Sequence, residues 1–292
     1  MTKKVIIVGA GPCGVLLAHY LLRRGDKYEI EIYERRHDPR VVAFSNSRTF
    51  PISLNERGMN SLSQIEGLES AVKDISLSVM GGIFHQKNGK TRYSPKNKPL
   101  VTLDRTKLAI VMLEQLIQKY DSSRLKIHFN CQCMETDFIA KTIQIKNLET
   151  SEEFNANYDL LIGADGASSV VRKNLLATED FECMEEYVTN DYKSLFLSAP
   201  DDNSSTQLKP GNIHSWMLND GTIVLLLFQK DGTLSGVIHF PHEKNQVQSL
   251  ASKEDVLTFF QQNLPEISKL ITEEEAESFL NRPISRMLTI RC

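Results

Sequence analysis

The chain has 292 residues, of which 41% are hydrophobic and 24% are charged, and its formal net charge at pH 7 is −3. This length allows two domains, and the composition is typical of a globular protein. The small negative charge gives no general attraction to nucleic acid or to an anionic membrane. The apolar runs are too short to span a bilayer, and no signal-peptide pattern opens the chain. We therefore predict a cytoplasmic protein with no nucleic-acid partner and no membrane span.

Five cysteines are spread along the chain, and Cys131 and Cys133 are the one close pair. No second cysteine pair or histidine pair completes a zinc-ligand set. His239 and His242 lie in a strand followed by a turn, where their spacing does not bring both rings to one point. The sequence therefore predicts structural thiols and no metal site.

The first 35 residues predict a strand, a glycine-rich turn, a helix and a second strand. Residues 5–8 are a β-branched run typical of a buried strand, and residues 9–14 form the turn. An apolar helix follows over residues 15–24, and the proline before it fits a first helical turn, where no backbone N–H is needed. Residues 28–33 alternate as the second strand, which ends on Glu34.

This unit has the pattern of a dinucleotide-binding turn. Gly9 permits the tight turn, Gly11 lets the backbone approach a pyrophosphate, and Gly14 lets helix and strand pack closely. The helix N-terminus presents free N–H groups to the phosphates, and Glu34 can accept hydrogen bonds from a ribose diol. The alternative is a plain strand-helix-strand turn with incidental glycines. We predict that the unit binds the ADP half of FAD or NAD through Gly9, Gly11, Pro12, Cys13, Gly14, Glu34 and Arg35.

The middle of the chain continues as alternating helices and strands. A helix is predicted near residues 54–65, and strands over 75–93 with a turn at Asn88 and Gly89. Asp104 caps a helix whose apolar residues share one face. The further predicted elements are a strand at 125–129, a small meander, a strand at 158–162 and a helix at 169–175.

The pattern changes after about residue 177. Three strands are predicted at 213–218, 223–228 and 234–240, and turns ending in Asp-Gly join them as hairpins. Ser252 and Asp255 then form a capping box before another helix.

Together these patterns predict an α/β fold with a Rossmann-type, parallel-sheet domain and a second domain of antiparallel sheet and helices. We assign residues 1–74 and 98–176 to the first domain and residues 75–97 and 177–292 to the second.

Three segments together resemble the class A flavoprotein monooxygenases, which share the fold of para-hydroxybenzoate hydroxylase. They are the N-terminal fingerprint ending at residues 33–35, the Leu-Asp-Arg-Thr-Lys-Leu motif at 103–108, and the Gly-Ala-Asp-Gly segment within 159–172. Within this family the chain resembles kynurenine monooxygenase, over residues 44–58 and 213–216. The resemblance implies that the first domain binds FAD and that the second binds the substrate.

The resemblance adds four cofactor candidates. Arg105 and Arg48 match arginines that contact or lie near the flavin, and Asp165 and Gly166 match a pair implicated in FAD and nicotinamide binding. Two structural alternatives stay open: Arg105 can be a surface arginine, and Asp165 can cap a helix after a strand. A cation is mildly unfavourable at a helix N-terminus, which favours an anionic partner for Arg105.

By resemblance, the enzyme reduces FAD with NADPH or NADH, traps molecular oxygen as a flavin C4a-hydroperoxide and hydroxylates a small, aromatic substrate. The single Rossmann unit agrees, since a nicotinamide then binds without a domain of its own. We assign no catalytic acid or base, because the flavin carries out the redox step. Two other interpretations stay open: an FAD-dependent oxidoreductase or reductase on the same fold, and a truncated, non-catalytic remnant.

The sequence departs from the family pattern in two places. In kynurenine monooxygenase an arginine and a tyrosine hold the substrate carboxylate, and the matching positions here are Gly82 and Pro99. Neither can supply a charge-assisted hydrogen bond, so we do not expect kynurenine as the substrate. The family's Gly-Asp motif after the last strands of the substrate domain is also absent. We expect the chain to stop, at Cys292, before that motif.

Overall fold

A computed structural model describes residues 1–42, 50–200 and 208–292. Its N-terminal unit is built on a four-stranded sheet in which every neighbouring pair is parallel. The strands, in sheet order, are β10 (Leu160–Gly163), β1 (Lys3–Val8), β2 (Tyr28–Tyr33) and β6 (Leu125–His128). Because the strands are parallel, the carboxyl ends of β1, β2 and β10 meet at one edge, which is where the predicted cofactor residues follow them.

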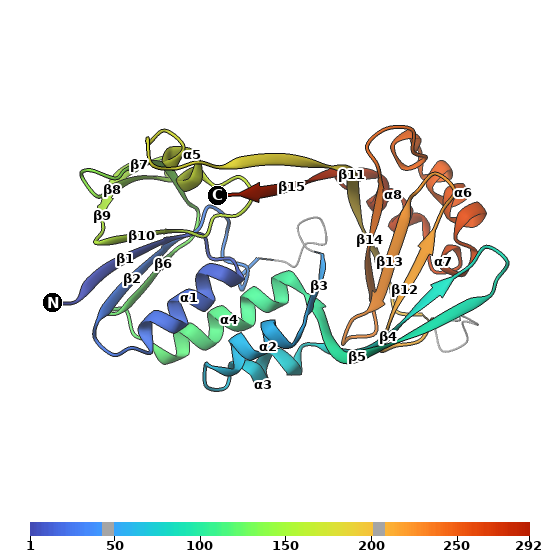
Figure 1. The fold of residues 1–292 in the computed structure, drawn as a ribbon, viewed down its shortest axis with the longest axis horizontal. Coiled ribbons are helices and arrows are strands. Elements are labelled where there is room, and N and C mark those ends of the chain that lie inside the picture. Colours follow the sequence, from blue (N-terminus) through green and yellow to red (C-terminus); the bar gives the residue numbers. More distant parts are fainter. Residues whose placement is uncertain (43–49, 201–207) are drawn as a thin grey trace.

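The parallel sheet is covered on both faces (Figure 1). Successive side chains of β1 point to opposite faces, so Val5 and Ile7 pack on one side and Ile6 and Val8 on the other. The first side is covered by α1 (Pro12–Leu22), α2 (Glu56–Ser63), α3 (Leu68–Asp74) and α4 (Arg105–Lys119). The second is covered by α5 (Val170–Leu175) and an antiparallel sheet of β7 (Cys131–Asp137), β8 (Thr142–Asn147) and β9 (Glu153–Asn157).

The second unit is an eight-stranded sheet, whose neighbours are antiparallel apart from the parallel pair β12 and β4. In sheet order its strands are β15 (Ser285–Arg291), β11 (Met184–Leu197), β14 (Leu234–Pro241), β13 (Ile223–Phe228), β12 (Asn212–Met217), β4 (Leu77–His85), β5 (Thr91–Asp104) and β3 (Pro51–Leu54).

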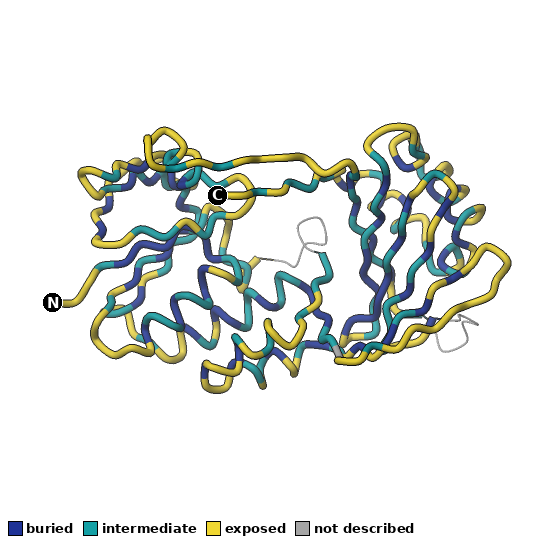
Figure 2. Tube along the Cα trace, viewed as in Figure 1, coloured by how far each residue is buried: buried dark blue, intermediate teal, exposed yellow. Residues whose placement is uncertain are grey.

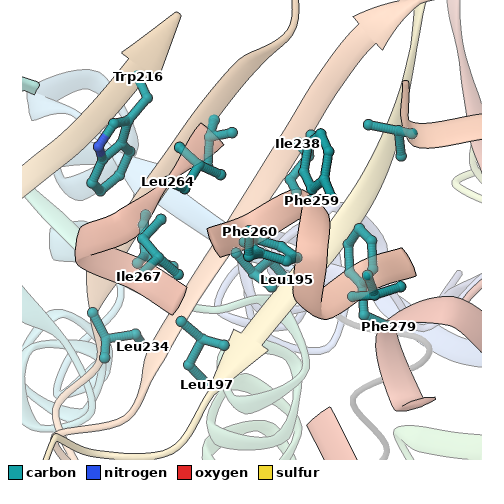
Figure 3. Packing of buried hydrophobic residues seen from close by; sticks show 14 of the residues in the cluster. Leu195, Leu197, Trp216, Leu234, Ile238, Phe259, Phe260, Leu264, Ile267 and Phe279 are labelled. Carbon is teal, nitrogen blue, oxygen red and sulfur yellow. The ribbon is translucent and has the colours of Figure 1, made fainter. Parts of the chain in front are cut away.

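One face of this sheet carries its own hydrophobic core (Figure 3). Phe260 and Phe279 meet edge to face with ring centroids 5.6 Å apart, and Trp216 from β12 lies in the same cluster. The helical cover consists of the 3₁₀ turn Val247–Ser249, α6 (Lys253–Asn263), α7 (Pro265–Ser268) and α8 (Glu273–Asn281). Capping boxes begin α6 at Ser252 and α8 at Thr272, as the sequence predicts for α6.

The two units lie side by side and are joined along two sides (Figure 1). β11 and β15 run together along one side, and β5 leads directly into α4 on the other. Buried segments form separate runs in the two units (Figure 2). The sheet face opposite α6, α7 and α8 is turned toward the parallel-sheet unit. The predicted fold class is therefore confirmed, and the proposed division of the chain at residues 75–97 and 177 stays a prediction.

In the parts of the chain that the structure describes, no helix is long and apolar enough to cross a membrane.

Candidate cofactor site

The glycine turn after β1 is shaped by two close backbone contacts. Gly9 has φ +105°, and a Cβ there would lie 2.5 Å from the carbonyl oxygen of Ala164. A Cβ on Gly14 would lie 2.2 Å from the carbonyl oxygen of Gly9. A Cβ on Gly11 would meet no heavy atom within 4 Å. Gly9 and Gly14 are thus required by the fold, whereas Gly11 faces open space through which a ligand can approach the backbone.

Helix α1 begins directly at this turn and leaves its first N–H groups available. Gly11 is the N-cap and provides no side-chain cap, and Pro12 occupies the first turn. Cys13 follows and is exposed. The positive end of the helix dipole and the uncapped N–H groups make this terminus a site for a phosphate or another anion.

Glu34 lies beside the turn. Its carboxylate accepts hydrogen bonds from the backbone N–H of Ala10 at 2.9 Å and of Arg36 at 2.9 Å. A carboxylate has about four acceptor positions, so two remain for a hydroxyl donor. A cavity of about 50 Å³ adjoins it, lined in part by Gly9, Glu34, Arg35 and Asp165. The predicted residues Gly9, Glu34, Arg35 and Asp165 are therefore brought together.

Asp165 supports the start of α5, whose N-cap residue is Ser169. Its carboxylate accepts hydrogen bonds from the Ser169 hydroxyl at 2.5 Å and from the backbone N–H of Val170 at 2.7 Å. Gly166 follows with φ +84°, a conformation that favours glycine. Arg172 holds this loop by donating to the Ala167 carbonyl oxygen at 2.5 Å. Asp165 thus binds the first turn of α5 without being its N-cap residue, and its contact with a cofactor stays a prediction.

Two cysteines, Cys131 and Cys133, line the same small cavity as Asp165, and their burial disfavours the thiolate form. Burial raises the pKa of the Cys133 thiol to about 12, and the nearby Asp165 carboxylate acts in the same direction. Burial also raises the pKa of Cys131. Across residues 1–42, 50–200 and 208–292, no group of three or more His, Cys, Asp or Glu side chains could hold a metal ion.

A larger cavity of about 660 Å³ lies between the two units. It is lined by Arg35, Arg36, His37, Phe50, Arg105, Asn130, Leu148, Glu149, Tyr192, Ser194, Arg282, Pro283 and Ser285. Four of these residues are arginines, and Glu149 is the one carboxylate among the described lining residues. A cavity with this excess of positive charge is suited to a ligand with several negative charges.

Arg105 projects into this cavity from the start of α4. The helix begins there because the Asp104 carboxylate accepts from the backbone N–H groups of Thr106 and Lys107. The Arg105 guanidinium lies 5.6 Å from the Phe50 ring centroid. Within the described parts of the chain it makes no hydrogen bond or ion pair, so its donors are available to a ligand. Arg48 lies outside the described residues.

The eight-stranded sheet supplies the opposite wall of the cavity. Tyr192 and Ser194 alternate along β11 with Lys193 and Leu195, which point to the helix-covered side. The Tyr192 ring pairs across the strands with His239, at 6.1 Å between centroids. By the same register, the neighbouring positions on this face include Val237, Leu225, Ser215, Phe84 and Gly82. The sheet residues that line the cavity itself are Tyr192, Ser194 and Ser285, and apolar side chains such as Val237 and Leu225 continue the same face beyond it.

Several residues that line this cavity were not predicted from the sequence. Arg36 and His37 directly follow the predicted Arg35, so the end of the second strand was a usable signal. No local sequence pattern indicates Tyr192, Ser194 or Arg282, because they reach the cavity from elements far apart in the sequence.

Comparison with known proteins identifies the cofactor of this fold. The sequence profile of a family described as "FAD binding domain" matches residues 2–268. The chain belongs to this family. Its residues fit FAD: the open backbone at Gly11 and the α1 N-terminus suit the pyrophosphate, and Glu34 suits a ribose.

Two proteins named kynurenine 3-monooxygenase are similar to this chain along nearly its whole length. The one from Drosophila willistoni is 29% identical over 99% of this chain, and the one from Flavobacterium psychrophilum is 27% identical over 100% of it. The chain spans 63% of the length of each of these relatives.

Solved structures show the same fold. One is the tetrameric form of 2-methyl-3-hydroxypyridine-5-carboxylic acid oxygenase, with a TM-score of 0.76 at 16% identity. The match covers 99% of this chain and 71% of that one.

Proposed function

We propose that the protein is an FAD-dependent monooxygenase that uses NADPH or NADH and molecular oxygen to hydroxylate a small, aromatic compound. The observation that carries the proposal is the 660 Å³ cavity, which has arginines from the FAD binding unit on one wall and Tyr192 and Ser194 of the eight-stranded sheet on the other. Binding sites for small molecules and cofactors commonly have volumes in this range. The relatives named kynurenine 3-monooxygenase support the reaction class.

The residues of this chain bind and orient the cofactor. The N-terminus of α1 and the backbone at Gly11 face the pyrophosphate, and Glu34 accepts from a ribose hydroxyl. Arg105 donates to the flavin end from the first turn of α4. When bound, FAD supplies the redox chemistry, and the protein supplies binding, orientation and electrostatics.

The substrate lies against the uncovered sheet face in this proposal. Tyr192 and Ser194 already contribute to the cavity wall, and Leu225 and Val237 continue the same face across the neighbouring strands. Apolar side chains on this face would exclude water from the reacting ring.

We propose that kynurenine is not the substrate. Gly82 lies on the uncovered face of β4, paired with Ser94, and has no side chain with which to bind a carboxylate. The test is oxidation of NADPH with and without L-kynurenine. Clear stimulation together with formation of hydroxykynurenine would overturn this proposal.

The reaction class is tested by following nicotinamide oxidation under isotopically heavy oxygen gas and analysing products by mass spectrometry. A panel of aromatic substrates is screened for stimulated nicotinamide oxidation. We expect one heavy oxygen atom in the hydroxylated product for each nicotinamide oxidised. Substrate-stimulated oxidation without oxygen incorporation would instead indicate a flavin reductase or dehydrogenase.

A further inference from the structure

Arg282 is a buried arginine at the meeting point of two cavities. It follows α8 as its C-cap and is 8% exposed. It lines the 660 Å³ cavity and a second cavity of about 490 Å³, which extends between α4, α8 and the ends of β11, β13 and β14. The guanidinium lies over the Phe196 ring at 4.8 Å, so one of its faces is fixed by an aromatic side chain.

The hydrogen-bond partners of Arg282 are neutral. It donates to the Ser194 carbonyl oxygen at 3.3 Å and to the Ser278 hydroxyl at 2.9 Å. A guanidinium has five N–H donors, so most of its capacity is not used by these two bonds. Among the described residues it forms no ion pair, and Glu275 acts on it only through its charge. Buried charges are normally paired, so this arrangement is unusual.

A second buried cation adds to the excess of positive charge near Arg282. Lys193 is 5% exposed, donates to the Leu280 carbonyl oxygen at 3.0 Å and lies 4.8 Å from the Phe279 ring centroid. Burial and the positive charge of Arg282 lower the pKa of Lys193 to about 8. Glu275 exerts an attractive influence on Arg282, but its oxygens bind Ser198 and Thr272. The 490 Å³ cavity already holds four carboxylates, those of Asp104, Asp231, Glu274 and Glu275. An added negative charge is therefore favoured on the other side of Arg282, in the 660 Å³ cavity, whose described lining has four arginines and one carboxylate.

The position of Arg282 separates it from the sites of the cofactor phosphates. It comes from the substrate-side sheet and its helices, whereas Gly11 and Arg105 belong to the FAD binding unit. In the sheet, β11 is four strand spacings from β4, which carries Gly82, or roughly 19 Å. An anionic group bound at Arg282 therefore lies at the other end of the uncovered face from Gly82.

We propose that Arg282 binds the carboxylate of the substrate, and that the protein acts on aromatic carboxylates held by this residue. The inference rests on the proposed function and names its substrate class. Arginine can bind a carboxylate through two parallel N–H donors, which fixes the orientation of the ring as well as its position.

Arg282 also has a structural role that any test must separate from binding. A cation at a helix C-terminus is favourable, and the bond to the Ser194 carbonyl connects α8 to β11. Loss of stability in an Arg282 variant is therefore no evidence for substrate binding. A difference in affinity between a charged and a neutral ligand of equal shape is evidence for binding. A purely structural role of Arg282 would not change the ratio of the two dissociation constants.

The probes are benzoate and benzamide, which have nearly the same shape and differ in charge. Their dissociation constants are measured by titration calorimetry, with and without FAD, for the unmodified protein, Arg282→Gln and the control Arg286→Gln. Arg286 is a neighbouring arginine that pairs with Asp191 at 3.6 Å and does not line either cavity. Thermal melting shows whether each variant is folded.

We expect the unmodified protein and Arg286→Gln to prefer benzoate by about ten- to a hundred-fold, and Arg282→Gln to bind both probes alike. The FAD affinity of Arg282→Gln should be unchanged. Absence of a benzoate preference in the unmodified protein, or its persistence in Arg282→Gln, would overturn the proposal, and so would a loss of FAD affinity at unchanged preference. Failure of oxygen incorporation would remove the monooxygenase function while leaving this ligand preference measurable.

Discussion

The backbone N–H of Ala10 donates to the Glu34 carboxylate at 2.9 Å, which joins the glycine turn after β1 to the end of β2. The Arg36 N–H donates to the other carboxylate oxygen at 2.9 Å. Glu34 therefore orders the cofactor turn and remains able to accept from a ribose hydroxyl.

Replacing Glu34 by Gln is predicted to weaken FAD binding about tenfold, since one carboxylate oxygen becomes an NH₂ donor that faces a backbone N–H donor. FAD titration by flavin fluorescence measures the effect. The control is Glu29→Gln, an exposed position on the same strand, which should leave the affinity unchanged. Equal affinities of the two variants would exclude Glu34 from the site.

Substitution of Gly11 is predicted to weaken FAD binding, whereas substitution of Gly14 is predicted to lower stability. A side chain on Gly11 enters open space, so Gly11→Val should fold with a free energy of unfolding within about 1 kcal/mol of the original and should lose FAD affinity by at least about tenfold. Gly14→Ala places a Cβ against the Gly9 carbonyl and should lower the free energy of unfolding by roughly 1–3 kcal/mol. Urea unfolding and FAD titration test both. Unchanged FAD binding by Gly11→Val would place the pyrophosphate elsewhere.

Lys193→Met is predicted to stabilise the protein at neutral pH. Burial lowers the folded-state pKa of Lys193 from 10.5 to about 8, so the unfolded chain binds more protons between these values and stability rises with pH across pH 8–10.5. At pH 7 the buried charge lowers the free energy of unfolding by roughly 3 kcal/mol. The hydrogen bond to the Leu280 carbonyl, which the variant loses, contributes about 1 kcal/mol in the opposite direction. Urea unfolding at pH 7 and pH 10 should show the variant more stable at pH 7, with the advantage reduced at pH 10. A variant less stable at pH 7 would contradict this.

His214 is predicted to contribute to loss of stability in acid. It is fully buried and hydrogen-bonds to His85 at 2.8 Å, and burial lowers its pKa from 6.5 to about 4. The unfolded chain therefore takes up the proton first, and stability falls as pH drops from 6.5 to about 4, by roughly 3 kcal/mol from this residue. His214→Phe should be less stable at pH 7 because these bonds are lost, but its deficit should shrink by pH 4.5. A deficit that is constant with pH, in unfolding measurements, would disprove the assignment.

The sequence predicted those parts of the fold that depend on residues close to one another in the chain. The glycine turn, the Asp104 cap and the hairpin strands β12, β13 and β14 each depend on residues close in sequence, and the structure contains all of them. Gly89, at the predicted turn, has φ +77°.

The elements that were missed depend on distant partners. The first half of β11 is exposed, with Tyr187 58% accessible, and it is held as a strand by pairing with β15 about a hundred residues later. Arg282 could not be predicted from a local pattern either, because its surroundings are formed by β11 and α8. Alternation of apolar residues does not reveal such pairings.

The account depends most directly on Arg105, whose donors are available in the cavity between the two units. Flavin fluorescence titration of the protein, of Arg105→Gln and of Lys107→Gln tests this role. Lys107 is the matched control, since it is a cation in the same helical turn that pairs with Asp231 at 2.7 Å. We predict that Arg105→Gln weakens FAD binding by about ten- to a hundred-fold and that Lys107→Gln changes it by less than about twofold. Equal FAD affinity of Arg105→Gln and the unmodified protein would contradict the placement of the flavin in this cavity.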